Sequence, residues 1–311
     1  MFCVPQAIRR PLGNIRRQMA ATSRHITALK DFPSARTALL TRDWPSAAEK
    51  DMLRKVSLRV STADNMYVPR EARHYLAAGL SGLRCITRVL DHLRTDRASI
   101  RSVLDLPSGG GRILRFLQIA FPDASLVACD TDRALLEFCG KVFGARTVPS
   151  VPDFNQVRLP ATFDLIWCGS LFTHIDETRC TDLLRLFYNH LSHEGVCIFS
   201  TAGTTAVSWL RNRAFSFGLS ALAQQSLMSQ VTDVGFGYGY VNYDRQNYGI
   251  SFVEHDKMVE LAGRAGKWSL AAFLESGWDD FQDVYAFTKR NVAPLNIPQR
   301  PFHHPTGWWK K

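Results

Sequence analysis

The sequence predicts an α/β protein with a doubly wound, mostly parallel, seven-stranded sheet and a helical extension at its N-terminus. From Ser102 onward, short apolar runs alternate with stretches of helical spacing, which is typical of βαβ units. The runs VLDL, LVAC, LIW and VCIF are almost continuously apolar, as expected of parallel strands that are covered on both faces. Glycines follow the first run, where such a fold turns from a strand into a helix.

The individual elements follow from the hydrophobic periodicity. Between Ala47 and Leu93 the apolar residues recur at helical spacing, with Tyr75, Leu76, Leu80, Leu83, Ile86 and Leu90 on one face. The predicted strands are Ser102 to Leu106, Ser125 to Cys129, Phe163 to Trp167, Val196 to Ser200, and two near Leu270 to Phe273 and Asp283 to Thr288. Helices are predicted to begin near Arg112, Arg133, Cys180 and Ala206, and a further helix is predicted over Asp256 to Ala265.

We predict three parts: a basic leader at residues 1–60 that is poorly packed or helical, a main domain at 61–289, and a basic tail at 290–311. Weak periodicity and Pro5, Pro11, Pro33 and Pro45 favour a poorly packed or extended chain over residues 1–45. Within the main domain, residues 211–250 interrupt the α/β rhythm. Their segment Gly235 to Tyr248 is rich in glycine and tyrosine, which predicts an irregular insert rather than a core element.

Composition excludes several classes of protein. The hydrophobic share of 46% is enough for a sizeable core, so wholesale disorder is excluded. The 7 cysteines are scattered and never form a C-x-x-C pair, so neither a disulfide framework nor a metal site is predicted and a reducing cytoplasm is expected. No stretch approaches the roughly 18 apolar residues of a membrane-spanning helix.

The net charge of +10 is concentrated at the two ends of the chain. Residues 1–60 hold 12 Lys or Arg against 4 acidic residues, and residues 289–311 hold 5 basic residues and no acidic one, which leaves a slightly acidic middle. A nucleic-acid enzyme would more often carry a basic stripe on its catalytic domain. We therefore favour solvated appendages over nucleic-acid arms, and over an organellar presequence in the acid-free first 30 residues.

The strongest chemical signal is a glycine turn between the first strand and its helix. It runs from Asp105 through Pro107, Ser108, Gly109, Gly110 and Gly111 to Arg112. A dinucleotide site needs G-x-G-x-x-G, but the third glycine position falls on Leu114, which argues against NAD and FAD. An acid at the strand end followed by alternate glycines instead favours an S-adenosylmethionine site. Asp130, 19 residues after Gly111, ends the next strand and is placed to accept the ribose hydroxyls.

These residues resemble the class I S-adenosylmethionine-dependent methyltransferases over roughly Tyr67 to Lys289. Pro107 replaces the first glycine of the family's D-x-G-x-G-x-G loop, which leaves the shape of the turn open. The stretches Asp64 to Tyr67 with His74 and Tyr75, and Gly277 to Asp283, resemble a bacterial branch of that family. The resemblance implies that the cofactor residues are Asp105, Pro107, Ser108, Gly109, Gly110, Gly111, Arg112, Asp130, Thr131, Asp153, Cys168, Gly169 and Ser170.

Each candidate on the acceptor side has two alternative roles. His174 follows the fourth predicted strand, where a neutral imidazole can serve as a general base; the alternative is that it caps or packs the next helix. Tyr240, Tyr243 and Tyr248, with Tyr238 and Asp244, could line the acceptor site or form an internal interface. Trp278, with Asp279 and Gln282, suggests a wall of the site as readily as a turn. For Tyr67, packing is favoured over covering the cofactor.

We predict transfer of a methyl group to an oxygen or nitrogen of a small molecule or glycan. One rival is an NAD-dependent oxidoreductase, which the missing third glycine disfavours. Another is a non-catalytic S-adenosylmethionine-binding protein. A nucleic-acid methyltransferase using the basic ends is disfavoured because Cys168-Gly169-Ser170-Leu171 stands where an N-P-P-Y-type tetrapeptide would be expected. The acceptor and the oligomeric state cannot be predicted from the sequence.

Overall fold

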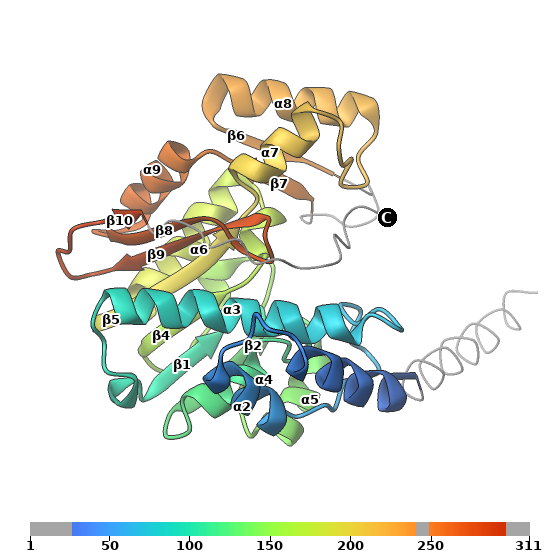
Figure 1. The fold of residues 1–311 in the computed structure, drawn as a ribbon. Coiled ribbons are helices and arrows are strands. Elements are labelled where there is room, and N and C mark those ends of the chain that lie inside the picture. The colour runs from blue at the N-terminus through green and yellow to red at the C-terminus, as the bar shows by residue number, and fades with distance from the viewer. Residues whose placement is uncertain (1–26, 241–248, 297–311) are drawn as a thin grey trace, which may run out of the picture.

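The fold is a twisted sheet with helices on both faces (Figure 1). The computed structural model describes residues 27–240 and 249–296, with the side chains of residues 295 and 296 excepted. The main sheet has the strand order β10-β8-β9-β5-β4-β1-β2-β3. Its strands are β1 (Ser102–Asp105), β2 (Ser125–Asp130), β3 (Arg146–Pro149), β4 (Phe163–Cys168), β5 (Leu191–Thr201), β8 (Ser269–Trp278), β9 (Gln282–Thr288) and β10 (Leu295–Asn296).

The predicted sheet is confirmed. Among its pairs only β5 with β9 and β8 with β9 are antiparallel, so the sheet is mostly parallel. Seven strands form the predicted sheet, and β10 adds two residues beside β8. Periodicity did not reveal β3, because this edge strand buries only Val148 and therefore shows no apolar run.

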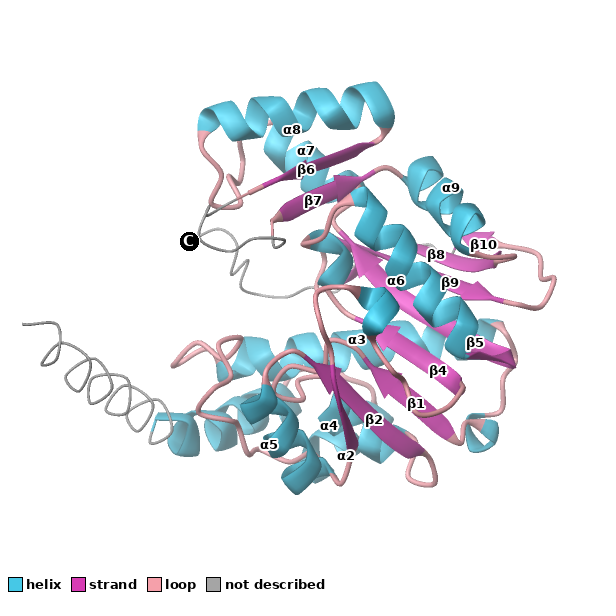
Figure 2. Ribbon diagram, turned by 180° about the vertical axis from the view of Figure 1, so that it is seen from behind, coloured by secondary structure: helices cyan, strands magenta, loops and turns pink. Residues whose placement is uncertain are grey.

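Alternate side chains of the central strands enter two separate cores. Val103 and Leu165 point to the face covered by α3 (Ala72–His92), α4 (Leu114–Ala120) and α5 (Arg133–Phe143). Their neighbours Leu104 and Ile166 point to the face covered by α6 (Glu177–His190) and α9 (His255–Ala265). Figure 2 shows these helices on the two sides of the sheet. This layering explains why the strands are apolar throughout.

The leader is more ordered than its composition suggests. Residues 27–40 are helical, and the side chains of Phe32 and Leu39 are buried in the same core as α3. The expectation of a poorly packed or extended chain is therefore wrong for residues 27–40. Apolar residues spaced along one face of this helix provide burial that outweighs the backbone hydrogen bond lost at Pro33. The next helix, α2 (Ala47–Lys55), begins with a capping box between Ser46 and Glu49.

The interruption at residues 211–250 corresponds to a small separate layer. After α7 (Thr204–Arg211), helix α8 (Ala221–Val234) packs on a two-stranded sheet of β6 (Phe236–Gly239) and β7 (Ile250–Val253). Residues 236–239 thus form a strand, which corrects the prediction of an irregular segment. The glycines of this strand lie where α8 approaches closely. A Cβ on Gly237 would lie 2.7 Å from the Leu227 carbonyl oxygen. Figure 1 shows this layer beside the end of the main sheet to which α7 is joined.

A buried carboxylate joins the small layer to the main sheet, and it should make stability depend on pH. Asp283 accepts hydrogen bonds from the backbone of Ser276 (2.7 Å) and of Thr204 (3.1 Å), at the start of α7. Burial raises the pKa of Asp283 from 3.8 to about 6. The native state therefore binds this proton more tightly than the unfolded chain, and this contribution to stability is present below pH 3.8 and lost as the pH rises through 6.

We expect wild type to lose about 3 kcal/mol of unfolding free energy relative to Asp283→Asn between pH 3.8 and pH 7. This amount corresponds to the shift of roughly two pKa units. Urea unfolding across that range measures it, with Asp123→Asn as a surface control. A constant difference between the two proteins at all pH values would contradict the expectation.

Candidate functional site

The candidate site lies where the parallel strands end. Asp105, Asp130 and Cys168 are the last residues of β1, β2 and β4, and these three strands are neighbours in the sheet. After β1 the chain continues to β2 on one side of it, whereas β4 pairs with β1 on its other side. The carboxyl ends of these strands are therefore the topological switch point of the sheet. Open α/β sheets bind their ligands at such a point.

The glycine loop is shaped by conformations and contacts that need glycine. Gly109 and Gly111 have φ values of 50° and 76°, which side-chain-bearing residues rarely adopt. A Cβ on Gly110 would lie 2.6 Å from Cγ of Asp64, and one on Gly111 would meet the ring of Phe143. Apart from its two chain neighbours, no described residue has an atom within 4 Å of the Cβ position of Gly109. The loop is thus packed tightly behind Gly110 and Gly111 and is open at Gly109; the Leu106–Pro107 peptide before it is cis.

Gly110→Ala is expected to weaken ligand binding at this loop by about 10- to 100-fold. Overpacking of this kind typically costs about 1–3 kcal/mol, and the clash with Asp64 must be relieved by moving the loop. Calorimetric titration with S-adenosylhomocysteine measures the effect. The control is Gly263→Ala in α9, where the added Cβ has no atom within 4 Å. Equal affinities of the two variants would show that the packing behind Gly110 does not shape the site.

Asp130 holds the glycine loop directly. Its Oδ2 accepts a hydrogen bond from the Gly109 N–H at 2.8 Å, and its Oδ1 accepts one from the Asp132 N–H at 3.0 Å. Each carboxylate oxygen has a second lone pair, so the predicted contact with ribose hydroxyls stays compatible with this arrangement. The contact with Gly109 was missed at the sequence level, because the spacing indicates proximity but not which backbone group is bound.

Two buried polar atoms at the glycine loop lack a hydrogen-bond partner in the described part of the chain. Asp105 and Ser108 are 1% and 5% exposed, and among the described residues neither Asp105 Oδ2 nor Ser108 Oγ has a hydrogen-bond partner. Burial raises the pKa of Asp105 well above its ordinary value, and the Asp130 charge raises it further, while Arg112 and the Leu114 N–H lower it. A buried polar atom without a partner is costly, so these atoms favour a ligand with hydrogen-bond donors, such as an ammonium group.

Arg112 supplies the opposite charge at the end of the loop. Its guanidinium carbon lies 5.2 Å from the centre of the Trp278 ring, and within the described ranges it makes no ion pair or hydrogen bond. The Trp278 ring itself is only 2% exposed, donates through Nε1 to the Ala78 carbonyl at 2.9 Å and meets Trp167 edge-on. This position favours packing over the predicted contact with an acceptor. The Trp278 ring instead packs against the guanidinium of Arg112.

The segment after β4 is fixed by a ring of hydrogen bonds. Ser170 has a φ of 62°, and its N–H donates to Ser200 Oγ at 2.9 Å. Ser200 donates to Gln282 Oε1 and Gln282 donates to Ser170 Oγ, both at 2.7 Å. Cys168 is fully buried, and a Cβ on Gly169 would lie 2.8 Å from the Trp278 ring. Of the three predicted residues, the partly exposed Gly169 and Ser170 are the ones a ligand can reach.

His174 is half-buried next to the small layer. Its Nδ1 lies 2.8 Å from the Gly249 carbonyl oxygen, and the Gly249 N–H donates back to the His174 carbonyl at 3.0 Å. Because a carbonyl only accepts, Nδ1 must carry a proton and the neutral ring has its lone pair on Nε2. Burial lowers the pKa of His174, which favours this neutral form.

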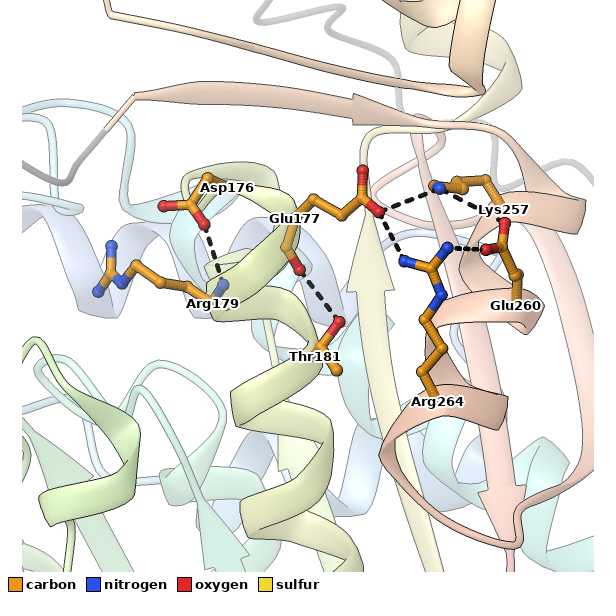
Figure 3. Close-up of polar contacts among 7 residues, drawn as sticks. All are labelled: Asp176, Glu177, Arg179, Thr181, Lys257, Glu260 and Arg264. Carbon is orange, nitrogen blue, oxygen red and sulfur yellow. Dashed lines mark hydrogen bonds and ion pairs between the residues drawn. The ribbon is translucent and has the colours of Figure 1, made fainter.

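The helix that follows His174 is capped without it. Asp176 accepts a hydrogen bond from the Arg179 N–H at 2.9 Å, which caps α6. Figure 3 shows how the first turn of α6 is then tied to α9: Glu177 pairs with Lys257 and with Arg264, each at 3.0 Å, while Arg264 also pairs with Glu260. Asp176, and not His174, is therefore the N-cap of this helix.

The remaining predicted residues lie at the periphery. Thr131 is exposed, and Asp153 is exposed after β3 with its carboxylate bound to Asn155 and Gln156 of its own turn. Tyr240 is 44% exposed and follows β6, with its ring against Tyr238. Three predicted residues lie outside the described ranges: Tyr243, Asp244 and Tyr248.

Several residues near the loop were not predicted as part of the site. Arg115, Tyr75 and Asp64 are buried behind the glycine loop and hydrogen-bonded to one another or to it. The available signal was the pair of motifs Asp64 to Tyr67 and His74-Tyr75, which resemble a branch of methyltransferases without indicating what the residues contact.

Comparison with known proteins finds a family for part of the chain. Residues 103–195 match a family described as a methyltransferase domain. The matched range runs from β1 into β5. A malonyl-[acyl-carrier protein] O-methyltransferase of Acetivibrio thermocellus is 26% identical over 146 residues, which are 47% of this chain and 51% of that protein. One of Bacillus cereus is 27% identical over 116 residues, 37% of this chain and 42% of that protein. The chain thus spans about half or less of the length of these relatives.

Two solved structures are similar at low sequence identity. An S-adenosylmethionine-dependent methyltransferase from Clostridium acetobutylicum has 14% identity and a TM-score of 0.47, covering 68% of this chain and 91% of that one. DesVI from Streptomyces venezuelae has 13% identity and a TM-score of 0.47, covering 69% and 93%. Separately, no helix in the described part of the chain is both long and apolar enough to cross a membrane.

Proposed function

We propose that the protein transfers a methyl group from S-adenosylmethionine to an oxygen or nitrogen of an acceptor. The observation that carries the proposal is the glycine loop, open at Gly109 and flanked by the carboxylates of Asp105 and Asp130. A ligand with an ammonium group at one end and a ribose at the other satisfies both carboxylates. The methyltransferase domain match at residues 103–195 supports the same reading.

The residues around the glycine loop fit each polar group of this cofactor. Asp105 and Ser108 would hold the ammonium group, Arg112 the carboxylate, and Asp130 the ribose hydroxyls. When bound, S-adenosylmethionine supplies an electrophilic methyl group on a sulfonium. The task left to the chain is to align an acceptor with that methyl group and to exclude water.

His174 is the residue we propose for removing a proton from the acceptor. With Nδ1 bound to Gly249, the lone pair on Nε2 can accept a proton from a hydroxyl or ammonium group as the new bond forms. Its lowered pKa keeps the base in its active form at neutral pH. A carboxylate acceptor would not need this step, because it carries no proton at neutral pH.

A small molecule or glycan is the acceptor class we propose. The relatives from Acetivibrio thermocellus and Bacillus cereus are named as O-methyltransferases, which supports oxygen as the methylated atom. The half-buried His174 offers a polar group for such an acceptor, and the exposed Tyr240 offers an aromatic ring.

Titration calorimetry with S-adenosylmethionine, S-adenosylhomocysteine and NADH tests the proposal. Micromolar affinity for the two sulfur compounds, with no binding of NADH, is the expected outcome. Transfer of labelled methyl groups to candidate acceptors then distinguishes an enzyme from a protein that only binds the cofactor. Preference for NADH, or no binding at all, would sink the proposal.

The role of Arg112 gives a sharper test of orientation. Arg112→Met is expected to lower the affinity for S-adenosylhomocysteine about tenfold, by loss of a charge-assisted contact worth about 1.5 kcal/mol or more. The affinity for methylthioadenosine, which lacks the amino-acid end, should stay unchanged. Arg133→Met, at the exposed start of α5, is the matched control. Equal losses for both ligands would place Arg112 elsewhere in the site.

A further inference from the structure

A fully buried guanidinium lies behind the glycine loop. Arg115 is on α4 and has 0% exposure. Its Nε donates to the Gly111 carbonyl at 2.9 Å, and its Nη2 lies 3.4 Å from the Gly110 carbonyl oxygen. One side chain therefore contacts two carbonyl groups of the glycine loop.

The same guanidinium also binds the N-terminal segment. Its Nη1 donates to the Ser57 carbonyl at 2.7 Å, and its central carbon lies 5.9 Å from the ring centre of Phe32 on the helix at residues 27–40. Phe32 packs in turn against Tyr67, with ring centres 5.1 Å apart. One charged group thus bridges the loop and a segment that begins more than 70 residues before it.

A hydroxyl links this guanidinium to a carboxylate. Tyr75 OH lies 3.4 Å from Arg115 Nη2 and donates to Asp64 Oδ2 at 2.6 Å. Asp64 is 1% exposed and packs directly against Gly110. A buried charge is tolerated only where its donors are satisfied, so displacing the N-terminal segment would leave part of this network without partners.

We propose that residues 27–66 are a working part of the cofactor site, and that Arg115 is a positioning residue that couples their docking to cofactor binding. The inference rests on the proposed function, because it assumes that the glycine loop holds S-adenosylmethionine. Coupling between two equilibria is reciprocal. A docked N-terminal segment holds the loop in its binding shape, and a bound cofactor in turn holds the segment in place.

Affinity measurements on three variants test the role of Arg115. Arg115→Met removes the contacts to the loop and should lower the affinity for S-adenosylhomocysteine about tenfold, within the range typical of coupled sites. Arg115→Lys keeps the charge and some donors, so it should lie between Arg115→Met and wild type. The control is Arg264→Met, because Arg264 pairs with Glu177 at 3.0 Å and joins α9 to α6, outside residues 27–66 and the glycine loop. Its affinity should stay within about twofold of wild type, as expected for an uncoupled site.

Hydrogen exchange on the wild-type chain gives a readout that does not depend on a variant folding. Addition of S-adenosylhomocysteine should slow exchange over residues 27–66 by about fivefold, besides protecting residues 103–113. Equal loss of affinity in the Arg115 and Arg264 variants would overturn the inference, as would protection of residues 103–113 alone. Absence of any binding by wild type would instead sink the proposed function, and this inference with it.

Discussion

Asp130→Ala is expected to abolish measurable binding of S-adenosylhomocysteine. In the proposed binding mode the variant loses two charge-assisted hydrogen bonds to the ribose. Together they would contribute about 3–6 kcal/mol, which corresponds to a loss of at least about 100-fold in affinity. It also releases the Gly109 N–H, which Asp130 binds at 2.8 Å. Calorimetric titration of the purified variant measures the loss.

Two further variants separate these contributions. Asp130→Asn can still accept a hydrogen bond from Gly109 but offers the ribose only one acceptor atom, so its affinity should be intermediate. Asp132→Asn keeps the cap of α5 and should bind like wild type. If Asp130→Ala bound as tightly as Asp132→Asn, the loop would hold a different ligand.

His174→Gln is expected to lower kcat by about 100-fold or more, which is the contribution typical of a general base. The effect requires an acceptor that must lose a proton, such as a hydroxyl. In wild type, kcat should fall only below pH 6.5, since burial lowers the pKa of His174 and the neutral form is the active one. The variant should show no such limb in its pH profile.

Kinetics with the first acceptor found by labelled methyl transfer measure both effects. His190→Gln is the matched control, because the ring of His190 also contacts a carbonyl, that of Leu186, but lies at the far end of α6. An unchanged kcat in His174→Gln would assign this histidine a packing role, or indicate a carboxylate acceptor.

The sequence predicted the features that depend on local patterns. Alternating apolar runs located the parallel strands, and the glycines after Asp105 located the turn, because each requirement is met by residues close together in the chain. The strand β3 was missed because it is an edge strand with a single buried residue. The segment 236–239 was misassigned because its glycines, which pack against α8, give no apolar pattern.

Features that depend on distant contacts could not be predicted. The ring of Ser170, Ser200 and Gln282 joins three ordinary polar residues from separate strand ends. Trp278 was open to two readings, and only the sheet and α3 around it favour packing. The leader was judged by its prolines, whereas burial of Phe32 against the main domain decided its structure.

The small layer also has a consequence for protein engineering. The chain leaves the main sheet after β5 and returns at the end of β7, and the two points lie side by side, because the Val253 N–H donates to the Ala202 carbonyl at 3.1 Å. Adjacent ends are what a segment needs to be exchanged as a unit. Residues 203–252 could therefore be replaced by the equivalent segment of a related enzyme, with both junctions formed on the existing backbone. Such chimeras would keep the main sheet and the glycine loop of this chain unchanged.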